Sequence, residues 1–450
     1  MEITNNEIQF SVVLEHHPVL AQTTAYKNMY LALLRYFTDT FCPDSGIADI
    51  LLQHYQKAFL PDGTGDIAIV QDAEEVKTLI RKISRRNIFR LRFSSYCGLF
   101  FTDCLLLCAE NDFGKANILL ENLKTYFHPK YHKKLDDTLA SVHHNEPLKS
   151  RREPAANMLE QFRKNIWFLH QPLKTVLITA TMSAGKSTLI NAIVGKPLAR
   201  TAQEACTGAL HLFLNKPFED NLISLSDQDG VFLDVAPDDL LQSEARGKCT
   251  VSTYFSMLSN SARRLCIVDT PGVNSAIEQT HGQITADALR NQAYDQILYL
   301  FRADGLGRDE DLSYLKQVSD MVPKEKILFM VNKLDLFKTS EDSIQESLNG
   351  VREDLRATGY ENPVLCPISA YFAYLVKQKL LGQELSEDEE DEFNFYVKKF
   401  RKPEFDLSCY YPAISDSDTD NLRLNDGLDD LRELGVKCGL YGLERLLLGA

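Results

Sequence analysis

The chain has 450 residues, a formal net charge of −14 and a sequence pI of about 5.3. A hydrophobic content of 44% with 25% charged residues is that of a globular protein with a sizeable core, which excludes collagen-like and wholly disordered chains. The acidic balance disfavours nonspecific nucleic-acid binding, so no nucleic-acid partner is expected, and the length suffices for roughly two to three domains.

The cysteines and the N-terminus indicate a cytoplasmic protein. Ten cysteines are spread along the chain, and Cys104 and Cys108 share an apolar stretch with no second pair and no histidine at ligand spacing. Core thiols in a reducing compartment are therefore favoured over a metal site. Residues 1–15 lack the basic start and apolar run of a signal peptide, and residues 96–109 are too few to span a bilayer.

Residues 1–170 are expected to form a helical domain of unknown role. Apolar residues recur at helical spacing, which predicts helices at 25–41, 47–59, 73–93, 99–110, 116–126 and 155–170. The stretch 129–145 is polar and histidine-rich, without a predicted element. A metal site is conceivable there, but exposed or satisfied side chains are the favoured interpretation of His128, His132, His143 and His144.

A basic stretch at residues 81–92 has two interpretations. Its cations are Arg81, Lys82, Arg85, Arg86, Arg90 and Arg92. They can contact anionic lipid or an acidic partner. The favoured alternative is a solvated helix face that offsets the acidic surplus of the chain, because charge runs usually solvate helices.

Residues 174–195, KTVLITATMSAGKSTLINAIVG, contain a strand, a small-residue turn and a helix start. The run 176–179 is apolar and β-branched, as in a buried strand, and 189–194 returns to helical spacing. Such a turn directs backbone N–H groups at phosphate oxygens, and the helix N-terminus adds partial positive charge. The context is that of a phosphate-binding P-loop.

Within this P-loop, Lys186 is expected to reach the terminal phosphates and the Ser187 hydroxyl to ligate Mg²⁺. Ala180 stands where the motif usually has glycine, which requires a negative φ there. The alternative is an ordinary strand-to-helix turn. The other predicted phosphate-site residues are Ser183, Ala184, Gly185 and Thr188.

From residue 171 onward, strands and helices alternate, which predicts an α/β domain with a mainly parallel sheet. Further strands are expected at 209–214, 265–268, 297–301, 327–331 and 364–368, and helices at 276–293, 309–321 and 341–357. Residues 371–424 interrupt the rhythm with a helix at 371–381, an acidic run at 384–392 that favours a solvated helix start, and a Ser/Asp loop. A single helix, 428–448, is expected to end the chain.

Two motifs after the P-loop indicate a metal-dependent switch. Asp269 and Gly272, in Asp-Thr-Pro-Gly, follow an apolar strand. The carboxylate can hold Mg²⁺ through water, and the glycine N–H can contact a γ-phosphate that exists only in the triphosphate state. Thr207, between the P-loop and the next strand, is a further expected Mg²⁺ ligand. The predicted catalytic set is Lys186, Ser187 and Thr207, and the predicted metal set is Ser187, Thr207 and Asp269.

Asn332-Lys333-Leu334-Asp335 follows another predicted strand and is expected to read the base. The Asp335 carboxylate can accept from the ring N–H and the exocyclic amine of guanine, which adenine does not offer in that arrangement. Asn332 would join this loop to the P-loop, and the Lys333 stem would cover the base. Ser369-Ala370, after the last strand, would direct a backbone N–H at the guanine carbonyl.

These motifs, in this order, resemble a P-loop GTPase of the translation-factor-related class. Ala180–Thr188 followed by LINAIVG, with 83 positions between Lys186 and Asp269, is similar to the GTPase domain of bacterial dynamin-like proteins. The resemblance covers 171–450 and implies a strand-and-helix insertion at 221–260, Mg²⁺-dependent GTP hydrolysis, dimerisation through the GTPase domain and peripheral membrane contact.

The resemblance has two departures. Met182 stands where dynamins have a water-positioning glutamine, so hydrolysis is expected to be slow without dimerisation or a partner. The chain also ends after one predicted helix, where the family continues into a helical stalk, so it is either a fragment or uses its N-terminal helices instead. Two alternatives to a remodelling GTPase are therefore carried: a nucleotide-gated interaction module with little hydrolysis, and a ribosome- or RNA-associated GTPase, which the acidic balance disfavours.

Overall fold

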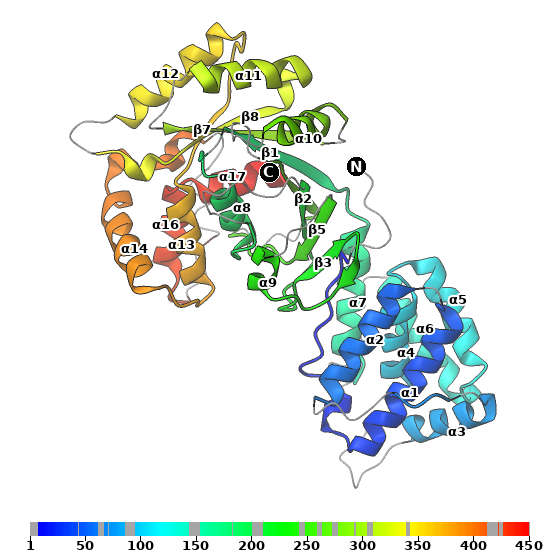
Figure 1. The fold of residues 1–450 in the computed structure, drawn as a ribbon. Coiled ribbons are helices and arrows are strands. Elements are labelled where there is room, and N and C mark those ends of the chain that lie inside the picture. Colours follow the sequence, from blue (N-terminus) through cyan, green and yellow to red (C-terminus); the bar gives the residue numbers. More distant parts are fainter. Residues whose placement is uncertain are drawn as a thin grey trace. The chain divides into compact units, whose positions relative to one another are not determined.

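The chain divides into two units, which are described separately (Figure 1). One unit comprises Asn5–Pro172 with Val231–Leu233, and the other comprises Met1–Thr4, Leu173–Gly230 and Asp234–Ala450. The computed structural model describes residues 8–43, 45–61, 67–70, 72–85, 95–143, 154–181, 183–199, 210–242, 248–258, 263–271, 278–291, 294–303, 309–338, 343–411, 422 and 426–449.

The helical unit packs around a fully buried central helix, α4. Its helices are α1 (Thr24–Phe41), α2 (Gly46–Phe59), α3 (Ala73–Ser84), α4 (Cys97–Cys108), α5 (Phe113–Lys124), α6 (His132–His143) and α7 (Ala156–Leu169), with 3-10 turns at Pro18–Ala21 and Pro129–Tyr131. Within the part of the chain that the structure describes, no helix combines the length and the apolar character needed to cross a membrane.

One predicted helix in this unit was too long, and one helix was not predicted. The helix predicted over 73–93 ends at Ser84, because Arg85 is extended, and residues 86–94 lie outside the described chain. The polar stretch at 129–145 contains α6, whose Leu135, Leu139 and Val142 face the core despite their polar neighbours. The sparse apolar residues were enough to bury one face of the helix.

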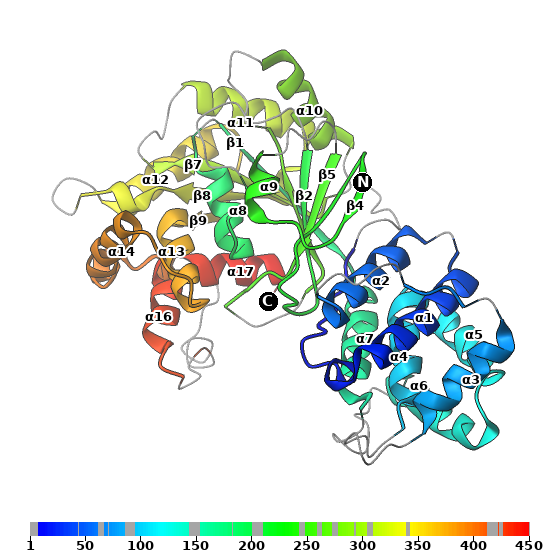
Figure 2. The ribbon, with the colours of Figure 1, turned by 60° about the horizontal axis from the view of Figure 1, so that its bottom comes forward.

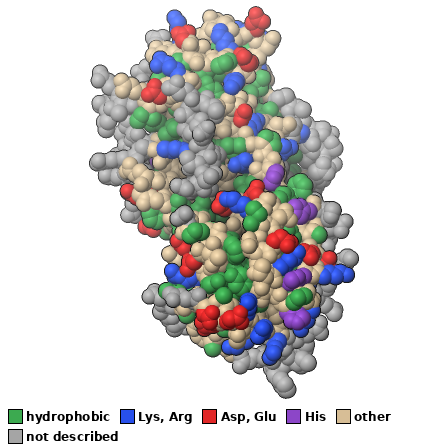
Figure 3. Space-filling model, turned by 90° about the vertical axis from the view of Figure 1, so that its right-hand side faces the viewer, with side chains coloured by type: hydrophobic (Ala, Val, Ile, Leu, Met, Phe, Trp, Pro, Cys, Tyr) green, Lys and Arg blue, Asp and Glu red, His purple; other side chains and the backbone are tan. Residues whose placement is uncertain are grey.

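Charged and histidine side chains of the helical unit have ordinary surroundings. Arg81, Lys82 and Arg85 are exposed, and Figure 3 shows acidic and basic side chains interspersed on the face that it draws. His132 Nε2 lies 3.0 Å from the Lys124 carbonyl oxygen, and the His143 ring stacks on Phe113. His128 Nδ1 accepts from the Lys130 N–H at 3.2 Å, and Arg86, Arg90, Arg92 and His144 lie outside the described chain.

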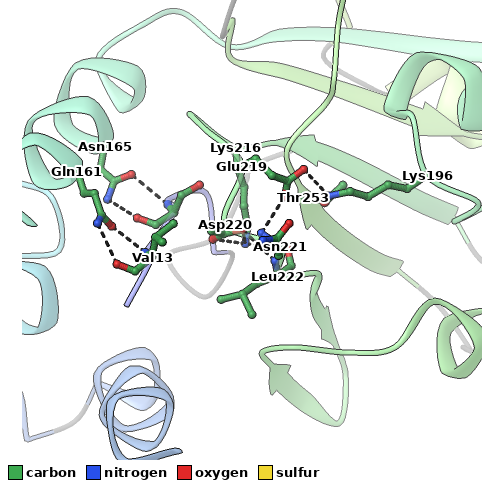
Figure 4. A network of polar contacts seen from close by, with 11 residues as sticks. Val13, Gln161, Asn165, Lys196, Lys216, Glu219, Asp220, Asn221, Leu222 and Thr253 are labelled. Carbon is green, nitrogen blue, oxygen red and sulfur yellow. Dashed lines mark hydrogen bonds and ion pairs between the residues drawn. The ribbon is translucent and has the colours of Figure 1, made fainter. Parts of the chain in front are cut away.

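The N-terminal segment lies extended against α7. Ile8, Phe10, Val12 and Leu14 alternate along it and are all buried. The Asn165 side chain donates to the Ser11 carbonyl and accepts from the Ser11 N–H, both at 3.0 Å. Gln161 repeats the arrangement one helical turn earlier with Val13, at 3.0 and 2.7 Å (Figure 4). Two helix amides therefore replace a neighbouring strand as hydrogen-bond partners of this segment.

Nine strands pair in the order β4-β3-β5-β2-β6-β1-β7-β8-β9, and all of them except β4 lie wholly within the second unit. Pairs involving β1, β7, β8 and β9 are parallel, whereas β2 pairs with β6 in antiparallel orientation. Figure 2 shows β2, β5 and β4 on one side of β1. The strands are β1 (Lys174–Ala180), β2 (Leu210–Asn215), β3 (Ser224–Asp227), β4 (Gly230–Phe232), β5 (Lys248–Thr253), β6 (Leu265–Asp269), β7 (Gln296–Arg302), β8 (Ile327–Asn332) and β9 (Leu365–Pro367).

Side chains alternate between two apolar layers along the central strands. On β1, Leu177 joins one buried cluster, and Val176 and Ile178 join the other. This alternation is the period of two that a strand covered on both faces requires. The helices are α8 (Lys186–Val194), α9 (Pro237–Gln242), α10 (Glu278–Asn291), α11 (Asp309–Met321), α12 (Ile344–Ala357), α13 (Ala370–Leu380), α14 (Glu387–Phe400), α16 (Asp429–Lys437) and α17 (Leu440–Leu448).

The mainly parallel α/β sheet and the helical N-terminal region confirm the predicted fold class. The prediction of a single helix at 428–448 was wrong. These residues form α16 and α17, and Gly439 between the two helices has a φ of +88°. A Cβ at Gly439 would lie 2.4 Å from the Pro367 carbonyl oxygen, so this break depends on a close backbone approach.

The insertion at 221–260 follows a turn that contains a buried ion pair. It contributes β3, β4, α9 and β5, as the resemblance implied. Lys216 is fully buried and donates to Asp220, 3.0 Å away, and to the Leu222 carbonyl (Figure 4). Burial lowers the pKa of Lys216, which the Asp220 carboxylate opposes. Nearby, Lys196 bridges Glu219 and the Thr253 hydroxyl, so the turn after β2 is held by paired charges.

Candidate functional site

The turn between β1 and α8 has alternating backbone handedness. Ser183 has a φ of +61° and Gly185 of +92°, whereas Ala184 between them has no positive φ. Such alternation directs successive N–H groups into one concavity, which is how proteins cradle anions. Lys186 begins α8, with Ser187 and Thr188 half-buried in its first turn. Ala180 is the last residue of β1, so its methyl group meets no conformational obstacle.

The Lys186 side chain contacts Asp269 in an ion pair, and the two side chains are 13% and 14% exposed. Asp269 ends β6, beside Ile178 of β1 in the parallel register. Because the carboxyl ends of neighbouring parallel strands share one edge, residues 83 positions apart meet there. Thr270 strengthens this junction by donating to the Ile178 carbonyl at 3.0 Å.

Asn332, at the end of β8, joins the two predicted nucleotide loops. Its Nδ2 donates to the Ala184 carbonyl at 2.8 Å, and its Oδ1 accepts from the Ala370 N–H at 3.0 Å. Asn332 is 2% exposed, so these bonds are shielded from water. A Cβ on residue 185 would lie 2.3 Å from Asn332 Nδ2, so only glycine at this position leaves room for the Asn332 side chain.

Asp335 lies buried in the short turn after β8. Its Oδ1 accepts from the Ser369 hydroxyl at 2.7 Å. Burial raises the pKa of Asp335 above its ordinary value, which the Ser369 hydrogen bond partly opposes. Lys333 precedes it at a φ of +68°, so the backbone reverses at this point. The carboxylate is held at the same sheet edge as the P-loop.

The backbone N–H groups of Ser369 and Ala370 both have acceptors within the protein. Ser369 N–H donates to the Cys438 carbonyl at 3.1 Å, and Ala370 N–H donates to Asn332. These residues thereby position the side chains of Asn332 and Asp335. The expected contact of one N–H group with a guanine carbonyl stays a prediction.

Two residues at the site were missed. Asp311, in the first turn of α11, accepts from the Thr181 hydroxyl at 2.6 Å, and both are buried. Lys399, near the end of α14, donates to the carbonyls of Asp335 and Phe337. No motif marks either residue. Asp311 lies in a predicted helix, and Lys399 follows the acidic run that was predicted to start one.

Several predicted residues lie outside the described chain: Met182, Thr207 and Gly272. Among the residues that the structure describes, no group of three or more His, Cys, Asp and Glu side chains is arranged to hold a metal ion. Ser187 and Asp269 are the described oxygen donors of the predicted metal set, and hydroxyl and carboxylate oxygens with water are suitable ligands for Mg²⁺.

The described loops form one edge with three chemical features. An anion cradle lies between β1 and α8, a lysine–aspartate pair lies beside it, and a buried carboxylate lies at the other end of the Asn332 bridge. This order fits a ligand with phosphates at one end and a hydrogen-bond-donating base at the other. The residues present therefore fit a nucleotide.

Comparison with known proteins finds a family match for the central segment of the chain. Residues 176–334 match the dynamin family. No curated protein matches the chain. The matched segment contains β1, the P-loop, β6 and the Asn332 bridge, so it coincides with most of the candidate site.

Solved structures give weaker likenesses. Two chains of an oligomerised bacterial dynamin pair, which senses and tethers membranes at long range, are 14% and 16% identical, each with a TM-score of 0.36. They cover 96% and 98% of this chain, which spans 62% and 76% of theirs. The Era protein of Aquifex aeolicus bound to GDP·AlF₄⁻ is 17% identical over 48% of this chain and 58% of its own, with a TM-score of 0.28. TM-scores this low support no inference about activity.

Proposed function

Residues 176–334 match the dynamin family, and we propose that the chain binds GTP with Mg²⁺ and hydrolyses it to GDP and phosphate. The observation that carries the proposal is the double hydrogen bond of Asn332. It connects the phosphate cradle with the loop of the buried Asp335, so that one nucleotide can reach both.

In this proposal, phosphate is bound by the N–H groups from Ser183 to Thr188 and by Lys186. Bound Mg²⁺ supplies charge neutralisation between the phosphate oxygens. Its ligands would come from Ser187, Thr207 and Asp269. Gly272 would contact the γ-phosphate. Asn332, Lys333 and Asp335 would hold the base, supported by Ser369 and Ala370.

Calorimetry of the full chain with Mg²⁺ tests the binding. GTP and GDP are expected to bind, ATP much more weakly, because Asp335 meets no pair of donors on adenine. Lys186→Ala should lose nucleotide affinity while keeping its fold, and Lys316→Ala, at an exposed position of α11, is the matched control. Equal binding of ATP and GTP would exclude the base-reading role, and unchanged affinity in K186A would exclude the P-loop assignment.

Phosphate release over a series of protein concentrations tests hydrolysis and dimerisation. Turnover that rises with concentration supports a homodimer formed through the GTPase domain. Turnover near the uncatalysed rate at every concentration supports the alternative, a nucleotide-gated interaction module, which the methionine at position 182 favours. Peripheral membrane contact is the remaining element of the proposal. It predicts co-sedimentation with liposomes that changes between GTP and GDP.

A further inference from the structure

The loop that carries Asp335 is held from α14, a helix outside the motifs. Lys399 donates from its Nζ to the backbone carbonyls of Asp335 and Phe337, on either side of the exposed Leu336. One ammonium group therefore fixes the backbone of the turn at two points. A third support comes from Ser369, whose hydroxyl donates to the Asp335 carboxylate.

Lys399 is buried in a way that requires these acceptors. The residue is 8% exposed, and its ammonium lies 4.6 Å from the centroid of the Phe405 ring. A buried cation without hydrogen-bond partners is costly, so the loop carbonyls and the ring are its compensation. Its neighbour Lys398, one position earlier, is exposed to solvent.

The helix that carries Lys399 is itself well anchored. Ser386 and Glu389 form a capping box, and acidic residues fill the first turn, so the acidic run begins α14 as predicted. At the other end, the Phe400 ring stacks on Phe372 of α13 with centroids 4.9 Å apart. Burial, followed by the carboxylates of Asp335 and Glu392, raises the pKa of Tyr396, on the same helix, to about 12.

We propose that Lys399 is a positioning residue for guanine selectivity, which holds the turn 335–337 so that the Asp335 carboxylate meets both N–H donors of the base. This inference rests on the proposed function. The alternative is that Lys399 only stabilises the packing of α14. The two differ in what they predict for nucleotides that lack one donor: a positioning role changes the preference of GDP over IDP, whose base lacks the exocyclic amine, and a packing role does not.

The experiment measures the affinities of the full chain with Mg²⁺ for GDP and IDP. In Lys399→Met the preference for GDP is expected to fall about tenfold or more, because one hydrogen bond to a charged acceptor is misaligned. The matched control is Lys398→Met, which should keep the wild-type preference. Phe393→Leu weakens the contact of α14 with Phe372 and keeps Lys399, so it should lower stability without changing the preference for GDP.

Lys399→Gln is the second variant, because it keeps a neutral donor and so tests the inference should Lys399→Met fail to fold. Its preference for GDP should also fall. A preference equal to wild type in a folded Lys399 variant would overturn this inference alone. Failure of the wild-type chain to bind GDP would overturn the proposed function, and the inference with it.

Discussion

At the residue scale, single side chains at the site serve two loops at once. Asn332 donates to the P-loop carbonyl of Ala184 and accepts from Ala370, so neither loop can move without breaking one of its bonds.

Asp103 likewise connects several elements of the helical unit through hydrogen bonds. Its fully buried carboxylate accepts from Tyr30 at 2.5 Å and Tyr55 at 3.1 Å and lies 3.1 Å from His17 Nε2. Each buried acceptor is thus matched by donors from several elements.

The Asp335 carboxylate predicts a pH dependence of guanine nucleotide binding. Only the ionised form accepts two N–H groups, and its pKa in the free protein is raised by burial. Affinity for GDP should therefore fall as the pH drops through this raised pKa, by up to about tenfold per pH unit. Calorimetry with GDP over a pH series measures this fall in affinity.

Asp335→Asn is the control for this pH dependence. An asparagine cannot ionise, so the variant should lose both the acid-side decline and the preference of GDP over ADP. A decline of the same size in the variant would assign the titration to another group.

At the element scale, the break between α16 and α17 positions the C-terminal helix. Gly439 has a φ of +88° and lies against the Pro367 carbonyl at the end of β9. From there α17 places Glu444 beside Lys377 of α13, with a buried N–O distance of 2.7 Å. Lys377 also donates to the Ile193 carbonyl in the last turn of α8, the helix that follows the P-loop. The last helix is therefore bonded, through one lysine, to the phosphate-binding helix.

Gly439→Ala should destabilise the α/β unit more than Gly382→Ala does. Both glycines have positive φ, which costs an alanine about 1–2 kcal/mol. A Cβ at Gly382 meets nothing within 4 Å, whereas at Gly439 it meets the Pro367 oxygen at 2.4 Å, which adds about 1–3 kcal/mol. Urea unfolding measures both variants. Equal losses would show that the close approach is relieved by a small backbone shift.

At the scale of the whole molecule, the two units have separate hydrophobic cores. One cluster joins the N-terminal segment with α1 to α7, and two others cover the faces of the sheet. All described residues of the candidate site belong to the sheet-containing unit. A ligand of this site should therefore stabilise one unit selectively.

Calorimetric unfolding with Mg²⁺ and GDP tests this selectivity. At a GDP concentration a hundredfold above Kd, the α/β unit should gain about 2.7 kcal/mol of stability, and its transition should move to higher temperature. The unfolding temperature of the helical unit should not change, and ADP should change the unfolding temperature of neither unit. An equal displacement of both transitions would show that the units unfold together.

Features that lie within a short stretch of chain follow from the amino-acid sequence alone. The P-loop, Asp-Thr-Pro-Gly and Asn-Lys-Leu-Asp each follow an apolar run, and parallel strands bring such ends to one edge, so the class of site was predictable. The tertiary structure alone decided the contacts between distant segments: Thr181 with Asp311, Lys399 with the turn at Asp335, Gly439 with Pro367, and Asn165 with Ser11. The periodicity of apolar residues indicates which face of a helix is buried. Which element that face packs against depends on how all the elements pack together.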